Sequence, residues 1–231
     1  APCAVRLWEE HSLFQWLQGR NVRSLEFDST YTSCERYEAL KIGLPEVSLM
    51  PRPLLLKEQR GIKDAEEIAA LKRAFALTLE GFEYAKGLLK EAITEEEIAF
   101  AFELYVRKRG ATGLSFEPIV AFGENSAYPH YRAGKTALGK NQIVLIDVGA
   151  VLDSYRGDLT RVVFFGDPDP TLAEWLAWTK EAQQKAIELA RPGCKIGDLD
   201  RAAREVFARH GVEELFVHGL GHGIGLETHE F

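Results

Sequence analysis

The spacing of apolar residues predicts short alternating elements in the first sixty residues. Leu13, Phe14 and Leu17 recur at helical spacing within residues 8–17, and residues 22–27 alternate apolar and polar as a β-strand does. The capping-box pattern of Thr32 and Glu35 predicts the start of a second helix, which would end at Gly43 and lead to a short strand at residues 47–49. This order predicts a small α/β domain over residues 1–60, bounded by Pro51-Arg-Pro and a charged run.

From Lys63 onward the pattern predicts longer helices. Asp64 with Glu67, and Thr94 with Glu97, have the spacing of capping boxes that begin helices. Behind the first box, one apolar helix face is predicted to be buried, formed by Ile68, Leu71, Phe75, Leu79 and Phe82.

A strand-rich block follows these helices and completes an α+β pattern over residues 61–231. The strands are predicted over residues 114–122, 143–150 and 155–165, and the helices after them over residues 171–190 and 199–210.

Composition narrows the class of protein. The 231 residues carry 28 Lys and Arg against 35 Asp and Glu, a net charge of −7, and no basic run marks a nucleic-acid binder. No apolar tract reaches the roughly 18 residues that cross a bilayer. Cys3, Cys34 and Cys194 lie far apart, which favours neither a disulfide framework nor a thiolate metal site. These features predict an acidic, cytoplasmic enzyme without a nucleic-acid or membrane partner.

Two aspartates stand out in the strand block. Asp147 interrupts a strongly apolar strand, and Asp158 begins the next one. A hairpin that turns at Leu152–Asp153 would place the two carboxylates directly opposite each other, where like charges are destabilising. A shared proton or a bound divalent cation would offset that repulsion.

A purely structural interpretation of these aspartates stays open. Asp158 would then serve a Gly-Asp turn, and Asp147 would cap a backbone group or pair with Arg156 or Arg161.

The histidines gather in two places. His130 lies in a loop, and His218, His222 and His229 fall within twelve residues interspersed with glycines. The glycines exclude a helix there, and in an extended chain the first two of these side chains would share a face. Imidazole and carboxylate together are typical of a hydrolytic divalent-metal centre. His11 and His210 are interpreted as structural.

Other catalytic signatures are missing from the sequence. The histidine spacing is not HExxH, no GxSxG is present, and neither a dinucleotide fingerprint nor a Walker loop occurs.

Five segments together resemble one family. They are HGLGHGIGLETHE at 218–230, LIDVG at 145–149, GDLTR at 157–161, NSAYPH at 125–130 and RGIKDAEEI at 60–68. The chain from about residue 60 resembles the pita-bread metallopeptidases, and within them the prolidase and aminopeptidase P branch. Residues 1–60 resemble only loosely the later part of that family's N-terminal domain.

The resemblance implies a pita-bread catalytic domain over residues 61–231, in which some residues bind metal and others contact the substrate. Asp147, Asp158 and His222 would bind two divalent ions, Mn²⁺ first, with Co²⁺ or Zn²⁺ as alternatives. A hydroxide between the ions would attack the carbonyl before a prolyl nitrogen. His130, His218 and His229 would position a proline-containing dipeptide or short peptide and stabilise the tetrahedral intermediate. The family also implies a homodimer.

One part of the family's pattern does not occur in the 231 residues. The family supplies two further glutamate ligands beyond the GHGIG motif, and Glu227 and Glu230 lie too close to His222 to replace them. We therefore expect this sequence to be the middle of a longer protein, and the metal site to be under-ligated in the chain as given.

Two alternatives to an Xaa-Pro dipeptidase or aminopeptidase remain. A methionine aminopeptidase shares the fold and the GHGIG core, although the segment before Arg60 and the loop at 128–130 argue against it. A pita-bread module that has lost catalysis and serves as a binding scaffold is the other.

Overall fold

The computed structural model describes residues 10–230, so Trp8 and Cys3 lie outside the described residues, as does the side chain of His11. The chain forms two compact units, Ala1–Ile62 and Lys63–Phe231. In the described part, none of the helices combines the length and the apolar character that crossing a membrane requires.

The first unit is a small α/β fold. Its elements are α1 (Glu10–Gln18), β1 (Ser24–Asp28), α2 (Cys34–Gly43), β2 (Ser48–Arg52) and α3 (Lys57–Gly61). The two strands run parallel around a small core of Leu17, Leu40 and Leu44. The expected start of α2 was one residue early, because Ser33 rather than Thr32 is the N-cap and accepts a hydrogen bond from the Arg36 amide.

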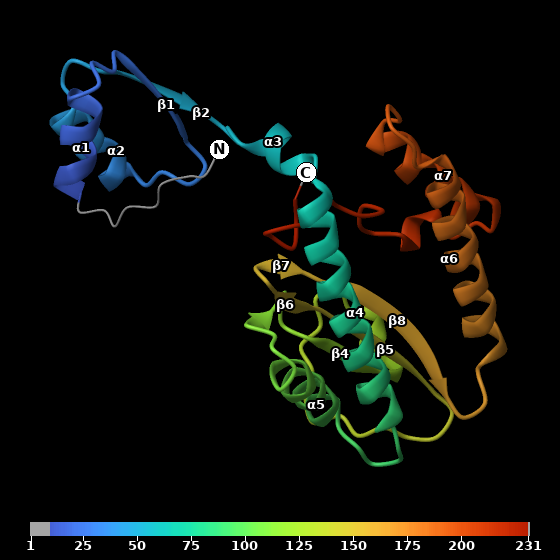
Figure 1. Cartoon of the computed structure of the whole chain (residues 1–231). Helices are drawn as coiled ribbons and strands as arrows, with labels where there is room; N and C mark the ends of the chain where they lie inside the picture. The colour runs from blue at the N-terminus through green and yellow to red at the C-terminus, as the bar shows by residue number, and fades with distance from the viewer. Residues whose placement is uncertain (1–9, 231) are drawn as a thin grey trace. The chain divides into compact units, whose positions relative to one another are not determined.

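The second unit combines helices with two antiparallel sheets (Figure 1). Its main elements are α4 (Ala65–Gly87), α5 (Glu95–Arg107), β3 (Gly113–Leu114), β4 (Ile119–Phe122), the 3₁₀ turn η1 (Gly123–Ala127), β5 (Gln142–Val148), β6 (Ala150–Leu152), β7 (Tyr155–Arg156), β8 (Leu159–Phe165), α6 (Pro170–Leu189), α7 (Ile196–Arg209) and the 3₁₀ turn η2 (Glu213–Leu215). The capping boxes predicted at Asp64 and Thr94 are confirmed at the starts of α4 and α5.

The sheet β4-β5-β8 is buried on one face and more open on the other. Val144, Ile146 and Val148 of the central strand β5 are fully buried and join a core with α4 and α5. The alternate residues of β5, which include Asp147, are only partly buried. The open face of this sheet therefore carries the first candidate residue.

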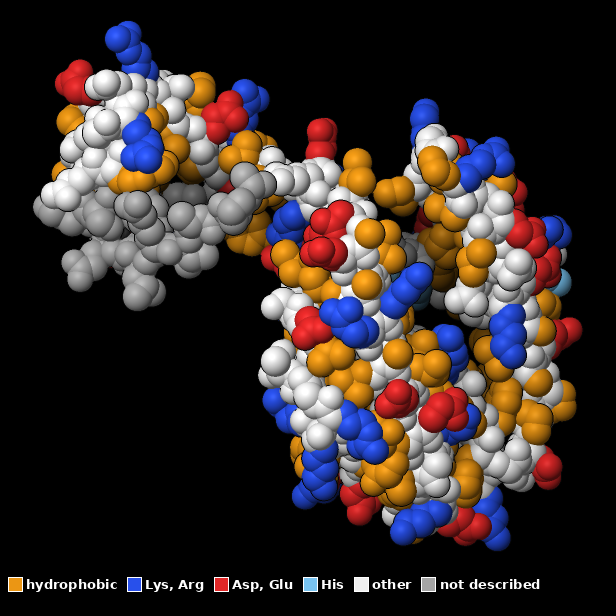
Figure 2. Space-filling view, in the orientation of Figure 1, with side chains coloured by type: hydrophobic (Ala, Val, Ile, Leu, Met, Phe, Trp, Pro, Cys, Tyr) orange, Lys and Arg blue, Asp and Glu red, His pale blue; other side chains and the backbone are white. Residues whose placement is uncertain are grey.

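The buried face of α4 differs from the expected one. Ala70, Ala74, Leu77 and Gly81 are buried, whereas most of the predicted face is exposed, as at Ile68, Phe75 and Leu79. Figure 2 shows hydrophobic side chains interspersed with charged ones over the surface around this helix. Small residues face inward because the helix packs close to the backbone: a Cβ on Gly157 would lie 2.2 Å from Thr78 Oγ1 and 2.8 Å from the Ala74 carbonyl oxygen.

The hairpin carrying the two aspartates turns one residue later than expected. Leu152 pairs with Tyr155, so the turn is Asp153–Ser154. Both turn residues have positive φ, 50° and 70°, as in the type I′ turns that match strand twist. Asp147 consequently lies opposite Thr160, and the predicted pairing with Asp158 was wrong by two positions.

The C-terminal segment is irregular rather than extended. Helices α6 and α7 pack through Ala182, Ala203 and Val206, and Leu220 packs against this cluster. Beyond η2 the backbone makes a single described bridge, between Gly223 and Glu230. His218 and His222 therefore do not share one strand face.

Candidate functional site

Asp147 is a partly buried carboxylate on the open face of the β4-β5-β8 sheet. It lies opposite Ile119 on one side and Thr160 on the other. Burial is the largest cause that raises its pKa from 3.8 to about 6. The hydrogen bond from Thr160 lowers the pKa, and the nearby charge of Asp158 raises it further. Within residues 10–230, its buried Oδ1 has no hydrogen-bond partner. An unsatisfied carboxylate oxygen in such a place is a position for a cation.

Asp158 lies diagonally across the strand pair from Asp147. Diagonal neighbours in a sheet are about 7–8 Å apart, a separation that leaves room between two carboxylates. Burial raises the pKa of Asp158, and the charges of His222 and His229 lower it. The corrected register thus separates the carboxylates but keeps them on the same face.

His222 faces this aspartate pair with a defined ring nitrogen. Its Nδ1 lies 2.8 Å from the Gly223 carbonyl oxygen, which only accepts, so Nδ1 carries the proton. Its Nε2 lies 3.5 Å from Asp158 Oδ2. A cation placed near both atoms would be bound by the imidazole nitrogen and the carboxylate together.

Two of the other predicted histidines lie near these groups. The charge of His130 acts on Asp147, and the backbone of His130 has a positive φ of 55°. His229 packs its ring 4.2 Å from that of His222.

His218 has different contacts. Its ring lies edge-on against Phe216, and its charge acts on Asp200 rather than on either strand aspartate.

One part of the structural interpretation, the pairing of Asp147 with Arg156 or Arg161, does not occur among the described residues. Arg156 donates to the carbonyl oxygens of Leu226 and Ser115, and Arg161 donates to that of Thr160. Both arginines are thus used by main-chain acceptors, and the strand aspartates have no recorded arginine partner among the described residues.

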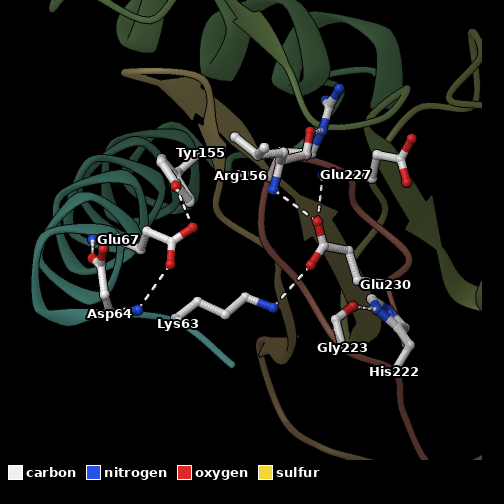
Figure 3. A network of polar contacts seen from close by, with 10 residues as sticks. Lys63, Asp64, Glu67, Tyr155, Arg156, His222, Gly223, Glu227 and Glu230 are labelled. Atoms are coloured by element: carbon white, nitrogen blue, oxygen red, sulfur yellow. Dashed lines mark hydrogen bonds and ion pairs between the residues drawn. The ribbon is translucent and has the colours of Figure 1, made fainter. Parts of the chain in front are cut away.

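Sequence reasoning missed the ion pair that anchors the histidine segment (Figure 3). Lys63 Nζ lies 2.8 Å from Glu230 Oε2, and the other oxygen of Glu230 accepts from the amides of Leu226 and Glu227. A Cβ at Gly225 would lie 2.6 Å from this carboxylate, so a side chain there would displace the carboxylate from its partners. Glu230 therefore shapes the loop between His222 and His229, and the only signal for it in the sequence was its place beside His229.

The donor set fits a divalent cation in kind. The possible donors are the unsatisfied oxygen of Asp147, the carboxylate of Asp158 and the Nε2 of His222. They are hard and borderline ligands of the kind that Mn²⁺, Co²⁺ and Zn²⁺ accept. Among residues 10–230, however, no three His, Cys, Asp or Glu side chains already converge as a metal-holding group. The described residues therefore supply possible metal ligands, but these ligands do not form a complete coordination shell.

Comparisons with known proteins show the family of the chain. The description of metallopeptidase family M24 matches residues 69–231. An uncharacterised peptidase of Staphylococcus aureus is 33% identical over 215 residues, which are 93% of this chain and 61% of that protein.

Solved structures are similar across nearly the whole chain. The X-Pro aminopeptidase from Thermotoga maritima has a TM-score of 0.91 at 31% identity, covering 98% of this chain and 65% of that one. The Xaa-Pro dipeptidase from Bacillus anthracis has a TM-score of 0.92 at 30% identity, covering 96% and 62%.

The chain thus spans less than two thirds of the length of these relatives. The expected mixed α/β fold of the pita-bread type is confirmed by the structural match. With most of its residues matched by the family description, the chain belongs to metallopeptidase family M24.

Proposed function

We propose that this chain carries the first metal ligands of a peptidase that hydrolyses the bond before proline, either a dipeptidase or an aminopeptidase. The observation that carries the proposal is the position of His222 Nε2, 3.5 Å from Asp158 Oδ2, with the charges of both residues acting on Asp147 of the open sheet face. Residues 61–231 would form the catalytic domain. The names of the similar solved structures, an X-Pro aminopeptidase and an Xaa-Pro dipeptidase, support the choice of substrate.

Asp147, Asp158 and His222 would hold two divalent ions, with Mn²⁺ preferred because carboxylate ligands dominate. Asp158 has the direct contact with His222, at 3.5 Å, and its charge acts on Asp147, so it would be a ligand shared with each of the other two. Ions bound there supply Lewis acidity for the attack of water on a peptide carbonyl.

The remaining histidines would act on the peptide. His130 is exposed beside Asp147, and His229 is exposed beside His222, so each can donate a hydrogen bond to a bound carbonyl or carboxylate. His218 would contact the peptide farther from the ions, since its own contacts are with Phe216 and Asp200.

Three substrates test the proposal. Gly-Pro, a longer Xaa-Pro peptide and a Met-Ala peptide are offered to the purified protein with Mn²⁺, Co²⁺ or Zn²⁺. Cleavage of Gly-Pro alone indicates a dipeptidase, and cleavage of the longer peptide indicates an aminopeptidase. Exclusive cleavage of Met-Ala would favour a methionine aminopeptidase and reject the proposal.

A non-catalytic scaffold is the second candidate, because no three donors already converge in the described residues. Metal analysis of the protein separates the two functions. Bound or activating metal supports the peptidase, whereas a protein of the relatives' full length that neither binds nor responds to these ions would be a scaffold.

A further inference from the structure

Glu95 is a fully buried carboxylate that lies outside the aspartate and histidine cluster. It is the first residue of α5, directly after the N-cap Thr94, and its exposure is 0%. Helix N-termini favour negative charge, but the Glu95 side chain extends beyond its own helix and contacts another segment.

Four donors surround this carboxylate. Oε1 accepts from the Phe122 amide at 2.8 Å and from Asn125 Nδ2 at 2.9 Å. Oε2 accepts from the Tyr131 hydroxyl at 2.8 Å and from the Gly134 amide at 3.1 Å. A carboxylate has acceptors only, so this arrangement uses both oxygens with neutral donors.

The four donors bracket His130. Two lie before it, at the end of β4 and in η1, and two lie after it, at positions 131 and 134. The loop between them holds His130 at a positive φ of 55°, a conformation that costs free energy unless the surroundings impose it. Each bond to Glu95 shortens the free length of chain on one side of His130.

We propose that Glu95 is a positioning residue that fixes the 122–134 loop and thereby sets the place of His130 beside Asp147. The proposal rests on the proposed function only in its last step, where His130 contacts the peptide. The loop-holding step stands on hydrogen bonds that are independent of substrate and metal.

The neighbouring residue Glu97 offers a matched control. It is a glutamate on the same helix, two positions away, and its carboxylate closes the capping box through the Thr94 amide at 2.7 Å. Glu97→Gln weakens the start of α5 but keeps the Glu95 carboxylate and its four donors. Glu95→Gln replaces one of the two acceptor oxygens of residue 95 by an NH₂ donor.

Hydrogen exchange of the purified protein tests the loop-holding step. In Glu95→Gln we expect amides of residues 122–134 to exchange about tenfold faster, with the rest of the second unit unchanged. In Glu97→Gln we expect faster exchange in the first turn of α5 only. Unchanged exchange in the loop, or an equal rise throughout the unit, would overturn the proposal.

Two milder variants keep the test decisive if Glu95→Gln does not fold. Tyr131→Phe and Asn125→Ala each remove one donor, and each should speed exchange in the loop by a smaller factor. If both variants leave the loop as protected as in the wild type, the proposal fails.

Kinetics test the last step. For Gly-Pro, Glu95→Gln should raise KM about tenfold at unchanged metal content, and Glu97→Gln should leave KM unchanged. An unchanged KM with a loosened loop would reject the link from Glu95 to the peptide. A wild type that cleaves no Xaa-Pro peptide would reject the proposed function instead, while the exchange result would still decide the role of Glu95.

Discussion

Lys63 Nζ and Glu230 Oε2 lie 2.8 Å apart although 167 positions separate the two residues along the chain. Their side chains are 14% and 1% exposed, so this is a largely buried ion pair. Lys63 directly precedes Asp64, the N-cap of α4, and Glu230 directly follows His229. The pair therefore joins the start of a core helix to the end of the histidine segment.

Removing one partner of this pair should be strongly destabilising. We expect Glu230→Gln to lower the free energy of unfolding by about 3 kcal/mol, because it leaves the Lys63 charge without its buried partner. Urea unfolding measures the loss. Asp153→Asn is the matched control, because the Arg73–Asp153 pair is 54% and 56% exposed and should contribute less than about 1 kcal/mol. Equal losses in the two variants would contradict this prediction.

The stability of the metal-free protein should depend on the protonation of Asp147. Its folded-state pKa of about 6 exceeds the ordinary value of 3.8, so the folded state holds the proton more tightly. Stability should therefore fall as pH rises from about 4 to 6 and stay reduced above that window. Thermal unfolding in the presence of a chelator, followed across this range, would measure the trend.

Asp147→Asn should remove that penalty. We expect the metal-free variant to exceed the wild type in stability at pH 8 by at most about 3 kcal/mol, and by less at pH 4.5. A variant that is less stable than the wild type at pH 8 would mean that the Asp147 carboxylate is not strained by its surroundings.

Asp158→Asn should abolish peptidase activity. Removing a residue that only hydrogen-bonds a metal ligand lowers activity by up to roughly 100-fold. The loss of kcat/KM in Asp158→Asn should be larger, because Asp158 would itself bind the ions. His210→Ala serves as the control, since His210 stacks on Trp178 with ring centroids 4.0 Å apart and lies outside the aspartate cluster. Comparable loss of kcat/KM in both variants would mean that the site is misplaced.

His229→Ala should lower turnover more than it lowers metal content. The ring of His229 packs against that of His222. In the proposed function His229 would donate to the peptide, so its loss would leave the proposed metal ligands in place. The ratio of metal to protein and kcat are measured on the same sample. A proportional loss of metal would assign His229 to the ions instead.

Local signals in the sequence were sufficient where a structure depends on adjacent residues. The capping boxes at Asp64 and Thr94 were predicted correctly because both partners lie three positions apart on one turn. The choice of the aspartates and of His222 came from single residues out of place in apolar or glycine-rich segments. In the structure His222 Nε2 lies 3.5 Å from Asp158 Oδ2, and the charges of both residues act on Asp147.

Features that depend on close packing or distant partners were not predictable in this way. The sequence prediction placed the large apolar side chains of α4 on its buried face. In the structure Gly157 approaches the helix so closely that the small residues of α4 are buried instead. The turn at Asp153–Ser154 contains no glycine to mark its positive φ angles. Glutamate is usually exposed, and the burial of Glu95 and Glu230 depends on hydrogen-bond donors that lie far away along the chain.

The two-residue turn at Asp153–Ser154 also limits how the intervening segment can change in length. Side chains of a strand alternate between faces, so a shift of register by two positions keeps Asp158 on the face of Asp147. A slip of this pairing by one residue would instead turn Asp158 toward the core and away from Asp147. Extra residues in this hairpin are therefore tolerated only where the turn itself takes them up, and the register between β5 and β8 is itself a requirement of the site.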